Sequence, residues 1–195
     1  MITAFVGTIY EESDTPISGN GKTGSMVGIA ALDHFQNGKT IWSNFHTGFS
    51  ECKGFQEMID TIGNEEHPEL ILCVSEMQNV LNSLGSSTKQ VLFIDKFCSQ
   101  LRKLKVDLYW DTQRFRNVHL RLRTYTDVIL IPIKCHFDGS QCNYNLCKKP
   151  HQVLLYSYKP AKDKPIVKFN MCEVGKLYDT NEIIYDQLKM PKKED

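Results

Sequence analysis

Residues 16–25 read Pro-Ile-Ser-Gly-Asn-Gly-Lys-Thr-Gly-Ser, and the interpretation of the whole chain starts from this stretch. A short apolar run, 1–7, precedes it, and a run compatible with a helix, 26–35, follows it. A strand, a Gly-rich loop ending in Gly-Lys-Thr and a helix, in this order, are typical of a phosphate-binding P-loop. The glycines let backbone N–H groups surround phosphate oxygens, and the helix N-terminus adds donors and a partial positive charge.

The motif predicts a role for individual residues. We expect Lys22 to reach the outer phosphates of ATP and the Thr23 hydroxyl to bind Mg²⁺. The residues expected to hold the phosphates are Gly19, Asn20, Gly21, Lys22, Thr23 and Gly24. The usual motif has a glycine where this chain has Pro16, and residues 8–16 look like an insertion between the strand and the glycines. The alternative interpretation is a polar turn that contains Gly-Lys-Thr by chance.

Composition sets limits on the fold and the function. The chain has 195 residues, of which 41% are hydrophobic and 24% are charged, and its formal net charge is zero. One domain with a substantial core is therefore expected. No global charge indicates nucleic-acid binding, so any DNA contact must come from local patches. No apolar run reaches about 18 residues and the start has no signal-peptide pattern, which favours a soluble intracellular protein.

Apolar runs alternate with amphipathic segments along the chain. Strands are expected at 1–7, 40–45, 69–76, 106–110 and 127–133, and helices at 26–35, 52–62 and 90–105. Two more strands, 153–158 and 166–170, are expected to pair antiparallel, and a last helix is expected at 181–188. The pattern predicts an α/β three-layer fold with a mostly parallel sheet. Residues 1–133 form its core, and 134–195 are an antiparallel C-terminal extension of the same domain.

Polar residues follow three of the expected strands. They are the Gly-Lys-Thr loop, Ser75-Glu76 and Thr112-Gln113. Because ligands of parallel sheets lie at the carboxyl ends of the strands, we expect these three groups to meet at one nucleotide site.

The order of these motifs resembles the FtsK/HerA superfamily of P-loop ATPases, and more narrowly the zonula occludens toxin-like and viral genome-packaging ATPases of phages and archaeal viruses. The resemblance covers about residues 1–133. Its matching segments are Gly21-Lys22-Thr23, 41–46, 70–76, Asn82-Ser83, 100–103, 106–108, Thr112-Gln113-Arg114, 121–123 and Thr126-Asp127.

The resemblance implies an ATPase that drives DNA translocation, packaging or export in a virus or mobile element. It implies that Glu76 orients the attacking water, that Gln113 senses the γ-phosphate, and that Arg121 or Arg123 is an arginine finger for a neighbouring subunit. The cofactors are then ATP and Mg²⁺, the assembly is a homo-oligomeric ring, and DNA is a partner. The expected location is the host cytoplasm, with attachment to a virion or membrane only through partners.

One departure from the family pattern concerns the metal. The family ends its Walker B strand in Asp-Glu, whereas this chain has Ser75-Glu76, so Ser75 would meet Mg²⁺ without bringing a charge. A nucleotide-binding assembly or morphogenesis factor with little or no hydrolysis is therefore the alternative function. Taken singly, Glu76 could be a helix N-terminal acid and Gln113 a turn residue. Arg121 and Arg123 could form the solvated face of a short strand.

Three of the seven cysteines lie close together in the sequence. The order Cys135-x6-Cys142-x4-Cys147-x3-His151 supplies four soft ligands in one loop, which suits a tetrahedral structural Zn²⁺. His136 could replace Cys135 as a ligand. The alternative to zinc is a set of free thiols in a hairpin. A bound zinc could staple the hairpin or present Lys148 and Lys149 to DNA, and a zinc-stabilised nucleic-acid-binding module without nucleotide chemistry is a third candidate function.

Overall fold

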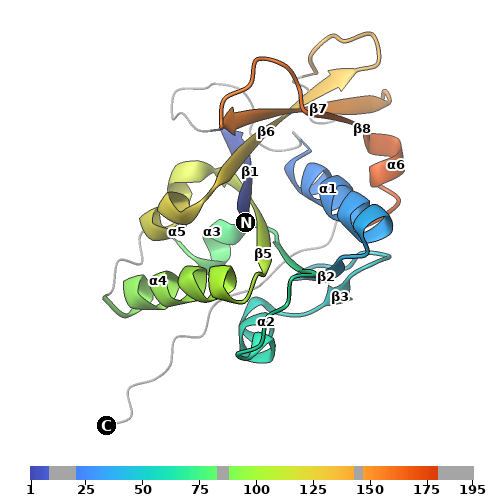
Figure 1. Cartoon of the computed structure of the whole chain (residues 1–195). Coiled ribbons are helices and arrows are strands. Elements are labelled where there is room, and N and C mark those ends of the chain that lie inside the picture. The colour runs from blue at the N-terminus through green and yellow to red at the C-terminus, as the bar shows by residue number, and fades with distance from the viewer. Residues whose placement is uncertain (9–20, 83–87, 143–146, 180–195) are drawn as a thin grey trace.

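The structure, a computed structural model, describes residues 1–8, 21–82, 88–142 and 147–179. An eight-stranded sheet forms its centre, in the order β3-β2-β4-β5-β1-β6-β7-β8 (Figure 1). The strands are β1 (Ile2–Thr8), β2 (Thr40–Ser43), β3 (Glu51–Cys52), β4 (Leu70–Val74), β5 (Asp107–Arg114), β6 (Val128–His136), β7 (His151–Lys159) and β8 (Val167–Asn170). The strands from β3 to β6 pair in parallel, whereas β7 and β8 pair antiparallel.

Helices cover both faces of the sheet. They are α1 (Lys22–Asn37), α2 (Phe55–Ile62), α3 (Met77–Val80), α4 (Thr88–Lys103), η1 (Phe115–Asn117), α5 (Leu120–Tyr125) and α6 (Met171–Val174). Helices α2, α3, α4 and α5 share one buried cluster with the sheet, and α1 and α6 share the other. Figure 1 shows α1 and α6 on the side of the sheet opposite α4 and α5. The α/β three-layer fold with a mostly parallel sheet and an antiparallel C-terminal extension is confirmed.

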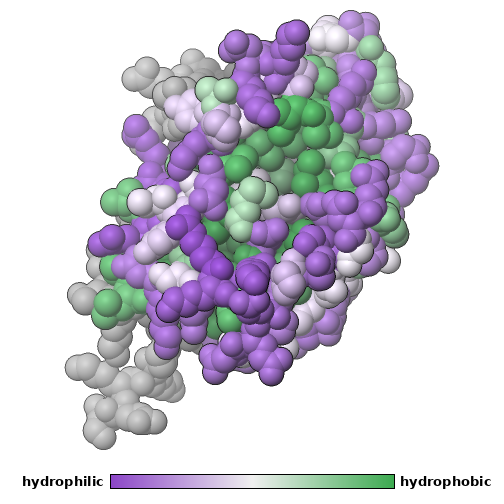
Figure 2. All heavy atoms as spheres, viewed as in Figure 1, coloured by the Kyte–Doolittle hydropathy of each residue, from purple (hydrophilic) through white to green (hydrophobic). Residues whose placement is uncertain are grey.

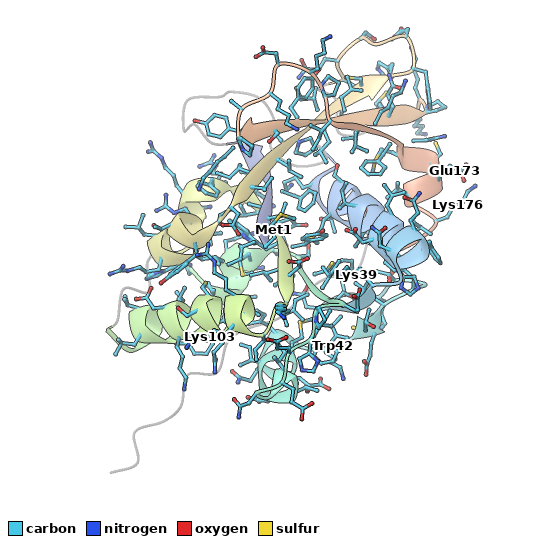
Figure 3. All side chains as sticks on the ribbon, in the orientation of Figure 1. Met1, Lys39, Trp42, Lys103, Glu173 and Lys176 are labelled. Carbon is cyan, nitrogen blue, oxygen red and sulfur yellow. The ribbon has the colours of Figure 1, made fainter. Side chains whose placement is uncertain are left out.

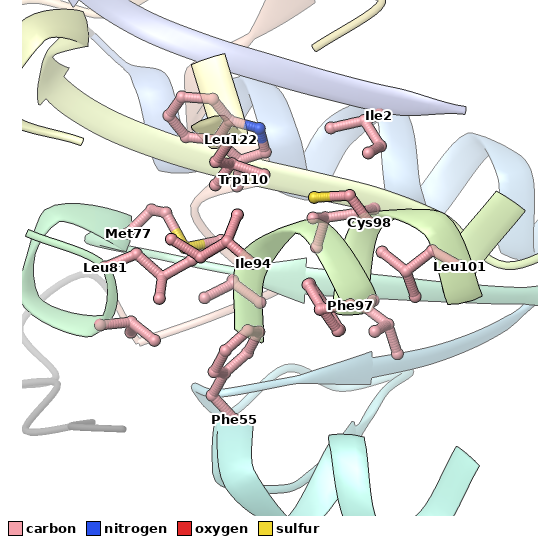
Figure 4. Close-up of a cluster of buried hydrophobic side chains, with 14 of the residues drawn as sticks. Ile2, Phe55, Met77, Leu81, Ile94, Phe97, Cys98, Leu101, Trp110 and Leu122 are labelled. Carbon is pink, nitrogen blue, oxygen red and sulfur yellow. The ribbon is translucent and has the colours of Figure 1, made fainter. Parts of the chain in front are cut away.

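The buried sides of the strands explain why the parallel strands read as continuous apolar runs. All five residues of β4 are buried, alternately against the two helical layers. Trp110 and Phe55 belong to the larger cluster, in which α4 packs on the sheet (Figure 4). Full burial of each such side chain contributes about 1.5–3 kcal/mol to the stability of the fold.

The outer surfaces differ between the two faces. Hydrophobic residues gather over α1 and beneath β7, whereas hydrophilic side chains cover the outer side of α4 (Figure 2). Polar contacts at the rim include the ion pair between Lys176 and Glu173, 3.0 Å apart beside α6, where Figure 3 labels both residues. None of the helices in the described residues combines the length and the hydrophobicity needed to cross a membrane.

Several boundaries differ from the sequence-based expectation. Strand β5 continues to Arg114, so Thr112 and Gln113 lie inside the strand and not beyond its end. The segment weighed as a short strand at 120–123 is the helix α5, in which Leu122 is buried while Leu120 is 61% exposed. Helix α6 was not predicted, and the helix expected at 181–188 lies outside the described residues.

Candidate nucleotide site

The Gly-Lys-Thr sequence lies at the N-terminus of α1. Gly21 is the N-cap residue, with a left-handed backbone (φ 80°) that favours glycine, and Lys22 and Thr23 begin the helix. Lys22 is only 6% exposed, which is unusual for a lysine and requires a compensating negative group. Gly21–Gly24 therefore have the placement that the P-loop interpretation predicts; Gly19 and Asn20 lie outside the described residues.

The next strand of the site is β4, which ends at Val74 and delivers Ser75 beside Thr23. The hydroxyl oxygens Thr23 Oγ1 and Ser75 Oγ are 3.5 Å apart. Asn44, which follows β2, holds Ser75 from both sides of its backbone: its Nδ2 donates to the Ser75 carbonyl at 3.1 Å, and its Oδ1 accepts from the Ser75 N–H at 2.8 Å. Ser75 is consequently fixed in position and 2% exposed.

A carboxylate that the sequence analysis did not single out lies behind Ser75. Asp111 on β5 is fully buried; its Oδ2 accepts from Ser75 Oγ at 3.0 Å, and its Oδ1 accepts from the Glu76 N–H at 2.8 Å. The register pairs Val74 with Trp110, so Asp111 is the first residue of β5 beyond the paired end of β4. A buried carboxylate of the neighbouring strand therefore lies one hydrogen bond away from Ser75.

Glu76 occupies a constrained position at the centre of the site. Its backbone is left-handed (φ 54°), a conformation that costs free energy in a residue other than glycine and is concentrated at functional sites. Desolvation by burial and the charge of Asp111 raise the pKa of the Glu76 carboxyl. Hydrogen bonds from Gln78 and Gln113 and the charge of Lys22 oppose this rise. The structure thus brings Lys22, Glu76 and Gln113 together.

Residues of the C-terminal extension close over the start of α1. A Cβ added to Gly21 would meet Val153 of β7 at 2.7 Å, and one added to Gly24 would meet the end of the flexible Met171 side chain. Tyr178 also reaches this end of α1, and burial together with the charge of Asp111 raises the pKa of its hydroxyl to about 12.

The two candidate finger arginines lie on α5, away from these contacts. Arg121 Nε is 3.9 Å from Asp95 of α4, and Arg121 is half exposed. The guanidinium of Arg123 lies over the ring of Phe115, and its Nε is buried with no hydrogen-bond partner among the described residues. Burial and the charge of Arg116 lower the pKa of Arg123. Neither arginine is brought to Lys22 of its own chain, and a finger offered to a neighbour stays a prediction.

The chemistry of the donor set fits a hydrated Mg²⁺ beside phosphates. Mg²⁺ prefers oxygen ligands, retains several waters and is usually bound through one or two carboxylates together with the phosphates of the substrate. Thr23 and Ser75 offer two neighbouring hydroxyls, and the buried Asp111 and the half-buried Glu76 supply negative charge next to them. The site therefore has the residues that an ATP–Mg²⁺ complex requires.

A second cluster of ligating side chains lies at the C-terminal end of β6 and the start of β7. His136, Cys142, Cys147 and His151 place one ligand atom each within 4.8 Å of all the others. This set differs from the expected one in one position, because His136 takes the place of Cys135. Successive residues of a strand point to opposite faces, so only one of these two neighbours can face His151, its partner across the β6–β7 pair.

A mostly parallel sheet with Gly-Lys-Thr at the start of α1 and polar groups at the end of β4 and within β5 is the α/β fold of P-loop NTPases. The chain is similar to the N-terminal domain of zonular occludens toxin from Neisseria meningitidis, with a TM-score of 0.54 and 19% identity over 91% of this chain and 98% of that one. The resemblance inferred from the motifs is confirmed at the level of the fold.

Two other solved structures are similar to a lesser degree. The genome packaging NTPase B204 from Sulfolobus turreted icosahedral virus 2, in complex with ATP-gammaS, has a TM-score of 0.47 and 12% identity over 85% of this chain and 98% of that one. The KaiC-like protein PH0186 from Pyrococcus horikoshii has a TM-score of 0.43 and 8% identity over 86% of this chain and 83% of that one. No protein-family model and no curated protein sequence matches the chain.

Proposed function

We propose that this protein binds ATP with Mg²⁺ and hydrolyses it. The observation that carries the proposal is that a buried lysine at a helix N-terminus, two hydroxyls and two carboxyl groups lie together where β4 ends beside β5. Phosphoryl transfer requires little covalent chemistry from the protein. It depends on positioning and on stabilising the charge of the leaving phosphate, and these groups are arranged for both.

Each residue then has a definite task. Lys22 and the first N–H groups of α1 hold the phosphates, and the Thr23 hydroxyl meets the metal. The Glu76 carboxylate orients the attacking water and accepts its proton. Its raised pKa suits this task, because a general base works best when its pKa is near the working pH. Gln113 hydrogen-bonds Glu76 and senses the γ-phosphate, so it couples the presence of the γ-phosphate to the position of the Glu76 carboxylate.

We assign the missing Walker B charge to Asp111. Bound Mg²⁺ would neutralise phosphate charge, as it does in P-loop enzymes generally. Asp111 accepts a hydrogen bond from the Ser75 hydroxyl, so the lone pairs of the Ser75 oxygen point away from Asp111. Mutation of a residue that orients a metal ligand in this way typically lowers metal affinity or activity by about 10- to 100-fold.

The work driven by hydrolysis is proposed to be the translocation, packaging or export of DNA by a homo-oligomeric ring in the cytoplasm of a host cell. The order of motifs supports this proposal, and so do the two arginines on α5. The buried, unpartnered Nε of Arg123 indicates a guanidinium held by packing against Phe115, which leaves its other nitrogens for a neighbour. An arginine supplied by a neighbouring subunit would couple hydrolysis to assembly.

ATP turnover with and without DNA tests the proposal. Wild-type protein is expected to hydrolyse ATP in the presence of Mg²⁺, and Lys22→Ala and Glu76→Gln are expected to abolish turnover. Lys22→Ala should also lose ATP binding, whereas Glu76→Gln should keep it, since Glu76 acts on the water. Wild-type protein that binds ATP but shows no turnover with or without DNA would contradict the motor function.

A second function follows from Ser75. If its hydroxyl holds the metal too weakly for turnover, the protein is a nucleotide-binding assembly factor. ATP would then stabilise the fold and change the oligomeric state, and Glu76→Gln would leave both effects unchanged. The substitution Ser75→Asp restores the usual acidic pair and distinguishes the two functions: it should raise turnover only in a protein limited by its metal site.

A further inference from the structure

We propose that His136, Cys142, Cys147 and His151 bind one structural Zn²⁺ and that this ion fixes the β6–β7 pair against the P-loop. The proposal does not rest on ATP hydrolysis. The four ligand atoms lie within 4.8 Å of one another. Tetrahedral Zn²⁺ with bonds of about 2.0–2.3 Å places its ligand atoms about 3.3–3.8 Å apart, so a small contraction closes the site.

The two histidines occupy directly opposed positions on neighbouring strands. His136 is the last residue of β6, His151 is the first residue of β7, and the antiparallel register pairs them. Their ring centroids are 4.8 Å apart. The ring nitrogens His136 Nδ1 and His151 Nε2 are both buried and have no hydrogen-bond partner among the described residues. The whole His151 residue is only 8% exposed. A buried ring nitrogen without a partner costs free energy, and a metal ion would satisfy both.

The cysteines come from the segment that joins the two strands. Residues 136–140 form a tight turn, in which the His136 N–H donates to the Ser140 carbonyl at 2.8 Å and Asp138 Oδ1 accepts from the Ser140 N–H at 2.8 Å. The chain then returns along β6, and the Cys142 N–H donates to the Lys134 carbonyl at 2.9 Å. Backbone hydrogen bonds therefore bring Cys142 back to His136.

The donor set favours zinc over other ions. Two imidazoles and two thiols are soft ligands that suit Zn²⁺ and do not suit Mg²⁺ or Ca²⁺. Four protein ligands also leave no open coordination position, so the site is structural and does not perform catalysis. Cys135 is not a member of the set: it is buried on the other side of β6, where its Sγ lies 3.8 Å from the Ile133 carbonyl.

The position of the cluster connects it to the nucleotide site. His151 is followed at the second position by Val153, whose Cγ2 would lie 2.7 Å from a Cβ on Gly21, so β7 forms a wall against the start of α1. Leu155, two residues further along β7, is fully buried in the cluster that contains α1. Zinc that fixes the first residue of β7 would therefore stabilise the wall beside the phosphate loop.

Metal analysis of the full chain, purified without chelators, tests the proposal. Zinc close to one ion per chain is expected. The variants Cys142→Ser and His151→Ala should lose most of it, whereas Cys172→Ser, at an exposed cysteine outside the cluster, should keep it. Lys22→Ala should also keep its zinc, so failure of the nucleotide site and failure of the zinc site are distinguishable.

Thermal unfolding gives a second measurement that does not depend on the folding of the variants. Chelation of the wild-type zinc is expected to lower Tm by about 5–15 °C, and added Zn²⁺ should restore it. Substitution with Co²⁺ should give the spectrum of a tetrahedral ion with two thiolates. The proposal is overturned by protein that contains no zinc and whose Tm does not respond to Zn²⁺, or by a Cys142–Cys147 disulfide. Zinc that survives in His136→Asn and is lost in Cys135→Ser would overturn the ligand set.

Discussion

Replacement of Asp111 by asparagine tests the proposal that Asp111 supplies the negative charge that Ser75 does not bring to the metal site. Asp111 accepts two hydrogen bonds while fully buried, from Ser75 Oγ at 3.0 Å and from the Glu76 N–H at 2.8 Å. The backbone N–H can only donate, so the asparagine oxygen must face Glu76. The new amide group then donates to Ser75, whose hydroxyl proton must turn toward Thr23, 3.5 Å away. The lone pairs of Ser75 Oγ would then no longer face Thr23, where they could bind Mg²⁺ or its water.

Two magnitudes follow from this geometry. A hydrogen bond to a charged group contributes about 1.5–3 kcal/mol and one between neutral groups about 0.5–1.5 kcal/mol, so the loss of stability is about 1–1.5 kcal/mol for each of the two bonds and about 2–3 kcal/mol in total. In a chain of this size, Tm should fall by roughly 4–12 °C. The loss of the orienting group should raise the Mg²⁺ concentration for half-maximal turnover about 10- to 100-fold.

The assay is an Mg²⁺ titration of ATP turnover for wild type and the variant, at a temperature where both are folded. Asp33→Asn is the matched control, since Asp33 also accepts a hydrogen bond from β5, from Tyr109 at 2.8 Å, but lies in the second half of α1. The control should lose some stability and keep the wild-type Mg²⁺ dependence. Refutation would be an unchanged Mg²⁺ dependence in folded Asp111→Asn protein.

Three further predictions concern other parts of the molecule. Because Glu76 must be ionised to act as a base and its pKa is raised, turnover should fall on acidification at a pH above the ordinary glutamate value of about 4.3, as a pH–rate profile would show. Gly28→Ala should lower stability by about 1–3 kcal/mol in denaturant titration, because its Cβ would lie 2.8 Å from the Phe169 ring. Arg121→Ala or Arg123→Ala should reduce kcat about 10³-fold without changing ATP binding if one of them is the finger.

These predictions have controls within the same chain. Asp111→Asn should move the acidic limb of the pH profile to lower pH, because the charge of Asp111 contributes to the raised pKa of Glu76. An acidic limb that does not move would show that a group other than Glu76 titrates there. Gly48→Ala adds a Cβ with no atom within 4 Å and should leave stability unchanged. The exposed basic residue Lys103 gives a charge control for the arginines, and equal loss of kcat in Lys103→Ala would refute a specific finger.

The sheet and the main site positions could be predicted because they depend on local patterns. Buried parallel strands read as apolar runs, and the residue types at their carboxyl ends follow directly in the sequence. Lys22, Glu76 and Gln113 were therefore placed at one site, although the last of them lies within β5 and not after it. The helix α5 was harder: Leu120 and Leu122 alternate with arginines, and six residues are too few to distinguish a strand from a helix.

Asp111 and His136 depend on contacts across strands, which a single sequence does not specify. Asp111 looked like the polar end of a strand, and only the register of β4 against β5 shows it buried behind Ser75. The available signal was a charged residue directly after the apolar run 108–110. His136 and Cys135 are adjacent, so the choice between them required the pairing of β6 with β7.

The most direct test of the account is ATP turnover by purified wild-type protein in the presence of Mg²⁺, measured beside Lys22→Ala. The account predicts Mg²⁺-dependent release of phosphate by the wild type and none by Lys22→Ala, with both proteins folded and both containing zinc. Equal release by the two proteins, or ATP binding by Lys22→Ala as tight as that of the wild type, would contradict a nucleotide site at the start of α1.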